Sequence, residues 1–209
     1  MSDLKICFLQ VTSPEIYEYS KYSTEVNKKY CAKQGYDYIE LPCINTNEFA
    51  HSWSKVFQSM YILENNNYDY IFFLDADAVV INFNKRLEEV ISKMKNSMAF
   101  SENGWNGGDL INGGSFIVSK NGGLDILKKS VEKVNTEMKD KKFGFPWEQS
   151  VFTKLHEEGE SIDVFPMNEI NSYWLYDVSS NDGQFIYHFM ARPLNEKIEI
   201  AKNLYEKYK

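Results

Sequence analysis

Two aspartates separated by one alanine follow the most apolar stretch of the chain. Residues 70–74 (YIFFL) are followed directly by Asp75, Ala76 and Asp77. In an open α/β sheet, ligands bind beyond the carboxyl ends of the strands. Two carboxylates at this position bring hard oxygen ligands close together, which suits Mg²⁺ or Mn²⁺, whereas burying both charges without a cation costs on the order of several kcal/mol. The pair therefore predicts a divalent metal site, and two solvated acids at a strand end are the structural alternative.

Two glycine-rich clusters lie six residues apart, just before an expected strand. They are residues 106–109 (NGGD) and 112–114 (NGG). Glycine lacks the side chain that keeps a backbone away from its neighbours. One such cluster is explained by a tight turn, but two in succession indicate a loop that approaches a ligand, with Asp109 and Asn112 as candidate contacts.

The elements that would position these residues alternate through the first half of the chain. Strands are expected at 4–11, 36–41, 70–74 and 78–81, and helices at 14–34, 53–63 and 85–95. A strand that is apolar on successive residues, as at 70–74, belongs in the centre of a sheet covered on both faces. The alternation predicts a three-layer α/β fold with a parallel sheet.

The second half is less regular. We expect strands at 98–101, 115–119 and 162–165, a glycine-rich loop at 104–114, and helices at 124–139, 147–157 and 194–208. The sequence contains no internal repeat, low-complexity tract or Pro/Gly/Ser-rich linker, so residues 1–209 are predicted to form a single domain.

Composition and charge exclude several classes of protein. With 43% apolar and 25% charged residues in 209, the chain is typical of a globular protein with a real core. The 23 basic residues are outnumbered by 30 acidic ones, giving a net charge of −7. Because proteins that neutralise many phosphates are usually basic, nucleic-acid binding is disfavoured.

The three cysteines (Cys7, Cys31 and Cys43) form no C-x-x-C pair and lie in apolar surroundings, which predicts buried free thiols and a reducing compartment. No segment fits a signal peptide, and no apolar run approaches the length of a membrane span. A cytoplasmic protein is expected.

Six blocks in order along the chain carry a family resemblance. They are GYDYIEL at 35–41, WSK at 53–55, YDYIFFLDADAVV at 68–80, NGGSFIVS at 112–119, PWEQSVF at 146–152 and YHF at 187–189. Together they resemble nucleotide-sugar glycosyltransferases of the GT-A fold, and among these the galactosyl/mannosyltransferase family of the GMA12/MNN10 type. The chain is also similar to soluble glycosyltransferase domains encoded by large viruses of chlorella-like algae. The membrane anchor and stem of the fungal enzymes have no counterpart here, so a viral chain would act in the host cytoplasm.

The resemblance implies a three-layer α/β/α fold with a central mixed, mainly parallel sheet. It also implies a nucleotide-binding half at about residues 1–103 and a sugar and acceptor half at about 104–209. Gln10, Val11 and Thr12 would form the uracil pocket, largely through backbone groups. Lys55 would reach the diphosphate as a point charge, although a lysine at a helix start is often only solvated.

For the metal, the resemblance implies that Asp75, with Ala76 beside it, contacts the ribose or the ion and that Asp77 binds the ion directly. His188 would supply a late third ligand, although a lone histidine in an apolar run is more often a core residue. A mixed oxygen and nitrogen set favours Mn²⁺ over Ca²⁺, with Mg²⁺ as the alternative ion.

The remaining motifs would contact the sugars. Residues 112–114 and Asp109 would form the sugar-binding loop. Glu148 or Gln149 would lie beside the anomeric carbon and the acceptor, with Trp147 stacking on a sugar. A carboxylate is also favoured at a helix start by the helix dipole, which is the structural alternative for Glu148.

The sequence therefore predicts a metal-dependent transfer of a hexosyl group from a UDP-sugar to a hydroxyl of a glycan acceptor. UDP-glucose, UDP-galactose and a UDP-deoxyhexose stay open as donors, and further domains of a longer polypeptide stay open as partners. Retention of anomeric configuration is implied by the resemblance alone. Two alternatives remain: a phosphatase of the HAD type, whose D-x-D-x-V motif matches residues 75–79 with Asp75 as nucleophile, and a non-catalytic UDP-sugar-binding module.

Overall fold

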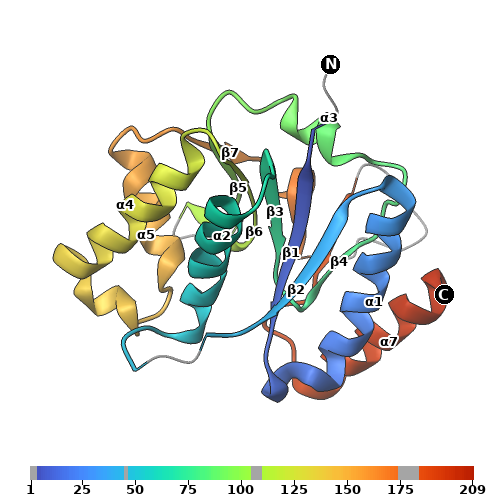
Figure 1. Ribbon diagram of the computed structural model, residues 1–209. Helices are drawn as coiled ribbons and strands as arrows, with labels where there is room; N and C mark the ends of the chain where they lie inside the picture. Colours follow the sequence, from blue (N-terminus) through green and yellow to red (C-terminus); the bar gives the residue numbers. More distant parts are fainter. Residues whose placement is uncertain (1–3, 45–46, 105–109, 174–183) are drawn as a thin grey trace.

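The computed structural model describes residues 4–44, 47–104, 110–173 and 184–209. Within these ranges, one six-stranded sheet runs in the order β2-β1-β3-β6-β5-β7 (Figure 1). Its strands are β1 (Ile6–Thr12), β2 (Asp37–Pro42), β3 (Tyr70–Leu74), β5 (Met98–Glu102), β6 (Ile111–Ser119) and β7 (Ile162–Phe165). The pairs β1–β2, β1–β3 and β5–β7 are parallel, and β6 is antiparallel to both of its neighbours. The predicted mixed, mainly parallel sheet is confirmed.

Helices cover both faces of this sheet. On one face, the core includes side chains of α2 (Ser54–Asn65), α4 (Gly123–Thr136) and α5 (Glu148–Glu157). On the other, it includes side chains of α1 (Tyr17–Gln34) and α3 (Leu87–Ile91). Strand β3 contributes Ile71 and Phe73 to the first core and Phe72 and Leu74 to the second. Burial of successive residues explains why this strand is apolar throughout.

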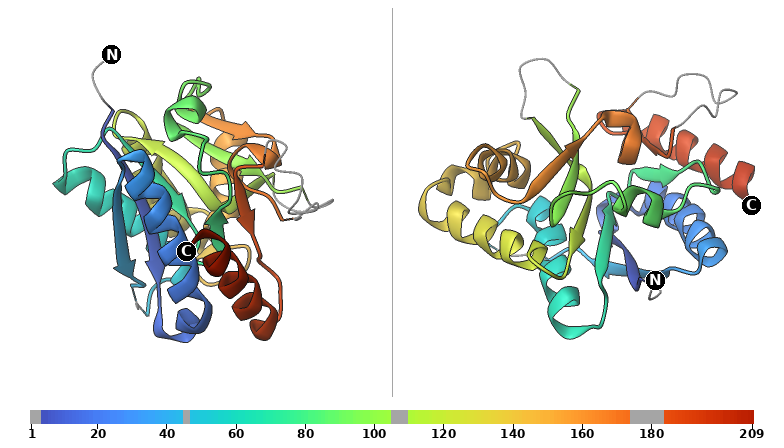
Figure 2. Two further views of the ribbon diagram at one scale, coloured as in Figure 1. Left: turned by 90° about the vertical axis from the view of Figure 1, so that its right-hand side faces the viewer. Right: turned by 90° about the horizontal axis from the view of Figure 1, so that it is seen from above.

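The last helix, α7 (Leu194–Tyr208), lies beside α1 in all views (Figure 2). Tyr19 of α1 packs edge-to-face on Phe189, just before α7, with ring centroids 6.2 Å apart. Shorter elements complete the described chain: 3₁₀ turns η1 (Pro14–Ile16), η2 (His51–Trp53) and η3 (Lys139–Lys142), and the helix α6 (Met167–Ile170).

A second, two-stranded sheet brings distant segments together beside the first. After β3 the chain turns, with the Ala78 amide donating to the Asp75 carbonyl, and continues as β4 (Ala78–Val80). β4 pairs antiparallel with β8 (Ile186–His188), and Ala78 lies opposite His188. This pairing sets a histidine from the end of the chain beside the aspartates that follow β3.

The structure corrects several sequence-based boundaries. β6 begins at Ile111, so Asn112, Gly113 and Gly114 lie in a strand and not in the expected loop. Pairing with β5 extends the backbone here, since Ser101 and Asn112 are register partners. The helix expected at 85–95 is limited to α3.

The predicted buried thiols are found at Cys7 and Cys31, whereas Cys43 is only half-buried. In the part of the chain that the structure describes, no helix is long and apolar enough to cross a membrane.

Candidate functional site

A cleft of about 510 Å³ opens at the carboxyl ends of β1 and β3. Five charged or polar side chains from four parts of the chain line it: Lys55 of α2, Asp75 and Asp77 after β3, Glu148 of α5, and His188 of β8. The cleft therefore lies where open α/β sheets bind their ligands.

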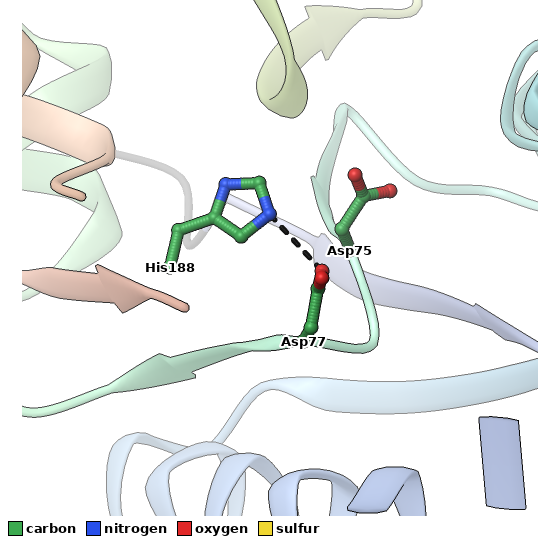
Figure 3. A group of neighbouring side chains, drawn as sticks. All are labelled: Asp75, Asp77 and His188. Carbon is green, nitrogen blue, oxygen red and sulfur yellow. Dashed lines mark hydrogen bonds and ion pairs between the residues drawn. The ribbon is translucent and has the colours of Figure 1, made fainter. Parts of the chain in front are cut away.

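Three of these residues form a candidate metal site. Asp75, Asp77 and His188 each offer one ligand atom, and the three atoms lie within 4.8 Å of one another. His188 Nε2 lies 3.0 Å from Asp77 Oδ1, and Asp75 lies on the other arm of the turn (Figure 3). Two carboxylates suit Mg²⁺ or Mn²⁺, and an imidazole as the third ligand favours Mn²⁺. The residues present thus fit the ion that the sequence predicts.

Backbone and buried polar groups fix the turn that carries the two aspartates. The Asp75 amide donates to the Gly114 carbonyl at 2.8 Å, which ties the turn to β6. Gln10 Nε2 donates to the Asp75 carbonyl at 3.2 Å, and Asn27 Nδ2 donates to the Ala78 carbonyl at 3.0 Å. The carboxylates are therefore held by groups from three different elements.

Gln10 lies beneath the cleft. Its side chain is fully buried, and its Oε1 accepts hydrogen bonds from Asn27 Nδ2 at 3.0 Å and the Tyr38 hydroxyl at 2.9 Å. Val11 and Thr12, the two residues that follow it, line the cleft. Of the three residues predicted to form the uracil pocket, two thus line the cleft. The side chain of the third, Gln10, supports the turn that carries Asp75.

Ala76 is also buried and does not line the cleft. Its carbonyl accepts a hydrogen bond from the Ser23 hydroxyl of α1. The backbone of the residue between the two aspartates is therefore tied to α1.

Lys55 links two acids at the centre of the cleft. Its Nζ lies 2.9 Å from Asp75 Oδ1 and 3.2 Å from Glu148 Oε1, and it donates to the Gly113 carbonyl at 2.9 Å. Burial alone would lower the pKa of this ammonium, but the carboxylates of Asp75 and Glu148 outweigh burial and raise it. Three partners satisfy the three donors of a lysine, so Lys55 holds both acids in place. A direct contact with a diphosphate stays a prediction.

Glu148 is a buried carboxyl with one oxygen available to accept a hydrogen bond. Its Oε2 has no hydrogen-bond partner among the residues that the structure describes. Burial raises the pKa of this carboxyl, although Lys55 acts in the opposite direction. A buried, unpaired acceptor is costly unless a ligand satisfies it, so Glu148 is placed to contact a bound molecule.

The two glycines of β6 leave room for the site. A Cβ at Gly113 would lie 2.8 Å from Glu148 Oε1, and a Cβ at Gly114 would lie 2.2 Å from His188 Cε1. Neither glycine has a positive φ, so it is contact and not backbone conformation that requires them. The sequence predicted that these glycines let the backbone approach a ligand. In the structure, the groups that lie close to them are the side chains of Glu148 and His188.

The neighbouring amides stabilise this strand. Gln149 Oε1 accepts from the Gly113 amide at 3.2 Å. Asn112 Oδ1 accepts from the Gly114 amide at 2.9 Å and from Asn171 Nδ2 at 2.8 Å. Both residues line the cleft, whereas Asp109, the third candidate sugar contact, lies outside the described residues.

Sequence reasoning missed one charged residue at the site. Lys197 of α7 donates to Asp77 Oδ2 at 2.6 Å. Burial would raise the pKa of Asp77, but His188 and Lys197 outweigh it and hold this pKa below its usual range. No motif marks Lys197, because its contact is made across 120 positions of sequence by the packing of α7 on α1.

Aromatic side chains stand at the rim. Phe145 lines the cleft yet is 74% exposed. It packs edge-to-face on Trp147 with ring centroids 5.0 Å apart, and the Trp147 indole N–H donates to the Phe143 carbonyl. The pair offers an aromatic surface beside Glu148.

Comparison with known families supports the expected resemblance. Residues 6–104, just under half of the chain, match the galactosyl transferase GMA12/MNN10 family. The matched segment includes Lys55, Asp75 and Asp77 and ends before Glu148 and His188. A search of curated proteins gave no significant match.

Solved structures show the fold. A glycosyltransferase involved in the glycosylation of the major capsid of PBCV-1 matches with a TM-score of 0.75 and 18% identity, over 95% of this chain and 98% of that chain. The galactosyltransferase LgtC, in complex with donor and acceptor sugar analogs, matches with a TM-score of 0.58 and 11% identity, over 96% and 95%. The glycosyltransferase GlyE of Streptococcus pneumoniae TIGR4 matches with a TM-score of 0.56 and 12% identity, over 99% and 63%. The chain thus has the GT-A glycosyltransferase fold and resembles the GMA12/MNN10 family in its first half.

Proposed function

We propose that this chain is a metal-dependent glycosyltransferase that moves a hexosyl group from a UDP-sugar to a hydroxyl of a glycan acceptor. One observation carries the proposal: Asp75, Asp77 and His188 converge within 4.8 Å beside the cleft of a glycosyltransferase fold. The family match over residues 6–104 supports the transferase class independently.

The donor would lie across the ends of β1 and β3. Val11 and Thr12 line the part of the cleft proposed for the uracil. Asp75, Asp77 and His188 would hold Mn²⁺ or Mg²⁺, which as a Lewis acid stabilises negative charge on a departing diphosphate. The Lys55 contacts at 2.9 and 3.2 Å fix the distance between this site and Glu148.

The transferred sugar would lie between the metal ligands and α5. In the reaction, the bond from the anomeric carbon to the diphosphate oxygen breaks, and its electron pair leaves with UDP. The acceptor oxygen forms the new bond, and its proton passes to the departing diphosphate. Glu148 Oε2, buried and unpaired among the described residues, would accept a hydroxyl hydrogen of the sugar or face the anomeric carbon. Gln149 and Asp109 are the other proposed contacts, and retention of configuration stays part of the proposal.

The acceptor would enter over the aromatic rim. Phe145 and Trp147 present ring surfaces beside Glu148, and such surfaces stack on the apolar faces of sugar rings. The capsid glycosylation named for the viral enzyme suggests a protein-linked glycan as one acceptor class to test. A cytoplasmic location is part of the same proposal.

The test is a donor screen. The protein is incubated with Mn²⁺ and UDP-glucose, UDP-galactose or a UDP-deoxyhexose, and released UDP is measured with and without glycan acceptors. We expect one donor to be consumed, with activity abolished by EDTA and reduced at least roughly 100-fold in Asp75→Asn, since removing a group that stabilises transition-state charge costs at least that much.

The same screen separates the alternatives. Phosphate release from a simple ester without nucleotide, lost in Asp75→Asn, would instead indicate the phosphatase. UDP binding without consumption of any donor would indicate a binding module.

A further inference from the structure

The ion pair between Lys197 and Asp77 places a cation of the protein at the candidate metal site. The two atoms, Nζ and Oδ2, are 2.6 Å apart, and the side chains are 17% and 14% exposed. At this distance and burial the charges are only weakly screened by solvent. The other oxygen of Asp77 faces His188 Nε2, so the ammonium contacts the same carboxylate that would bind the metal.

Lys197 is held in this position by its surroundings. Its ammonium lies 5.3 Å from the ring centroid of Tyr19, on the neighbouring helix α1. Its amide donates to the Pro193 carbonyl, which places it in the first turn of α7. Since a helix dipole disfavours a cation in the first turn, the contacts with Asp77 and Tyr19, and not the helix, stabilise the ammonium there.

The charges around the site are nearly balanced before any ligand binds. Each aspartate is already paired with an ammonium group, Asp75 with Lys55 and Asp77 with Lys197. Lys55 is engaged between Asp75 and Glu148, so Lys197 is the ammonium that neutralises Asp77. A divalent ion would enter beside this positive charge, whereas the diphosphate of a nucleotide would bring at least two negative charges, which an ammonium attracts.

We propose that Lys197 makes metal binding at this site depend on the nucleotide. The inference rests on the proposed function and deepens it. Lys197 weakens binding of the free metal ion, because its ammonium competes for Asp77 and repels the ion. The same ammonium strengthens binding of the ion together with a diphosphate. By linkage, the metal then raises the affinity for the nucleotide by the same factor.

The experiment is calorimetric titration of Mn²⁺ into the full chain, with and without saturating UDP. It compares the wild type with Lys197→Gln, Lys197→Arg and Lys202→Gln, the last removing an exposed charge from the same helix. For Lys197→Gln we expect Mn²⁺ alone to bind roughly tenfold more tightly, a change of about 1.4 kcal/mol. The gain in Mn²⁺ affinity caused by UDP should fall by a similar factor. Lys197→Arg and Lys202→Gln should behave like the wild type.

Wild-type values for Lys197→Gln, or weaker binding of Mn²⁺ alone, would overturn the inference. Lys197→Met, which keeps the aliphatic stem against Tyr19, serves as a second neutral variant if the glutamine variant does not fold. If both neutral variants stay unfolded at saturating Mn²⁺, Lys197 is structural and the inference fails. If Mn²⁺ restores their folding, UDP should add less to their stability than it adds to that of the wild type at the same Mn²⁺ concentration, and an equal contribution from UDP would overturn the inference. Absence of Mn²⁺-dependent UDP binding in the wild type would instead refute the proposed function.

Discussion

Adding one methyl group at Gly114 should break the metal site and leave the fold intact. In Gly114→Ala, the new Cβ would lie 2.2 Å from His188 Cε1 and 2.8 Å from its Nδ1. Carbon atoms pack at about 3.5–4.0 Å, so the ring must move by more than about 1 Å. The contact between His188 Nε2 and Asp77 Oδ1, now 3.0 Å, would then be lost.

The expected cost in stability is small. Overpacking a buried site costs about 1–3 kcal/mol, and His188 is only 3% exposed. Replacing glycine by alanine at a compatible backbone conformation returns about 0.4–1 kcal/mol through the unfolded state. The net loss in the free energy of unfolding should therefore be about 0–2.6 kcal/mol, measured by urea denaturation of the metal-free protein.

The loss in metal affinity should be much larger. Mutating a partner of a metal ligand typically costs 10–100-fold in affinity, so displacing the ligand itself should weaken Mn²⁺ binding by roughly 100-fold or more. Calorimetry in the presence of UDP measures it. Gly113→Ala is the matched control, because its Cβ would meet Glu148 Oε1 at 2.8 Å and not the histidine. It should keep Mn²⁺ binding and lose transfer. Wild-type Mn²⁺ affinity in folded Gly114→Ala would refute the assignment of His188 as a ligand.

Three further predictions test the other parts of the site. Burial raises the pKa of Glu148 in the folded state above its value in the unfolded chain. Protonated Glu148 therefore stabilises the fold at pH values below the unfolded-state pKa, and this contribution is lost as the pH rises through the folded-state pKa. The unfolding free energy of Glu148→Gln, measured in urea, should therefore increase relative to the wild type between about pH 4 and 8, and a constant difference would contradict this. Lys55→Met leaves Asp75 and Glu148 without their shared cation and should lower the free energy of unfolding by about 3–5 kcal/mol; a loss below about 1 kcal/mol, the range of exposed pairs, would show that this ion pair matters little. Phe145→Ala should change stability by less than about 0.5 kcal/mol and raise the acceptor KM roughly two- to tenfold, as loss of aromatic stacking does; an unchanged KM would exclude an acceptor contact.

The sequence predicted the centre of the site because local pattern determines it. An apolar strand followed by Asp75 and Asp77 has one place in an α/β sheet, at its carboxyl edge. The family blocks added His188, and the β4–β8 pairing shows why: it sets Ala78 opposite His188 and so brings the histidine to the turn.

What the sequence did not predict depends on tertiary contacts. Asn112, Gly113 and Gly114 have a loop-like composition, yet pairing with β5 extends them into β6. Lys197 contacts Asp77 only because α7 packs beside α1. Gln10 was predicted at a nucleotide pocket largely through its backbone, and the hydrogen bonds of its side chain with Asn27 and Tyr38 beneath the cleft were not predicted. None of these contacts can be predicted from the spacing of residues along the sequence.

Calorimetric titration of UDP into metal-free protein, with and without Mn²⁺, tests the central proposal most directly. The proposal predicts tight binding of UDP only when Mn²⁺ is present, and loss of that binding in Asp77→Asn, whose amide no longer offers a charged ligand at the site. Binding of UDP that is equal with and without Mn²⁺, or binding of no nucleotide under either condition, would contradict it.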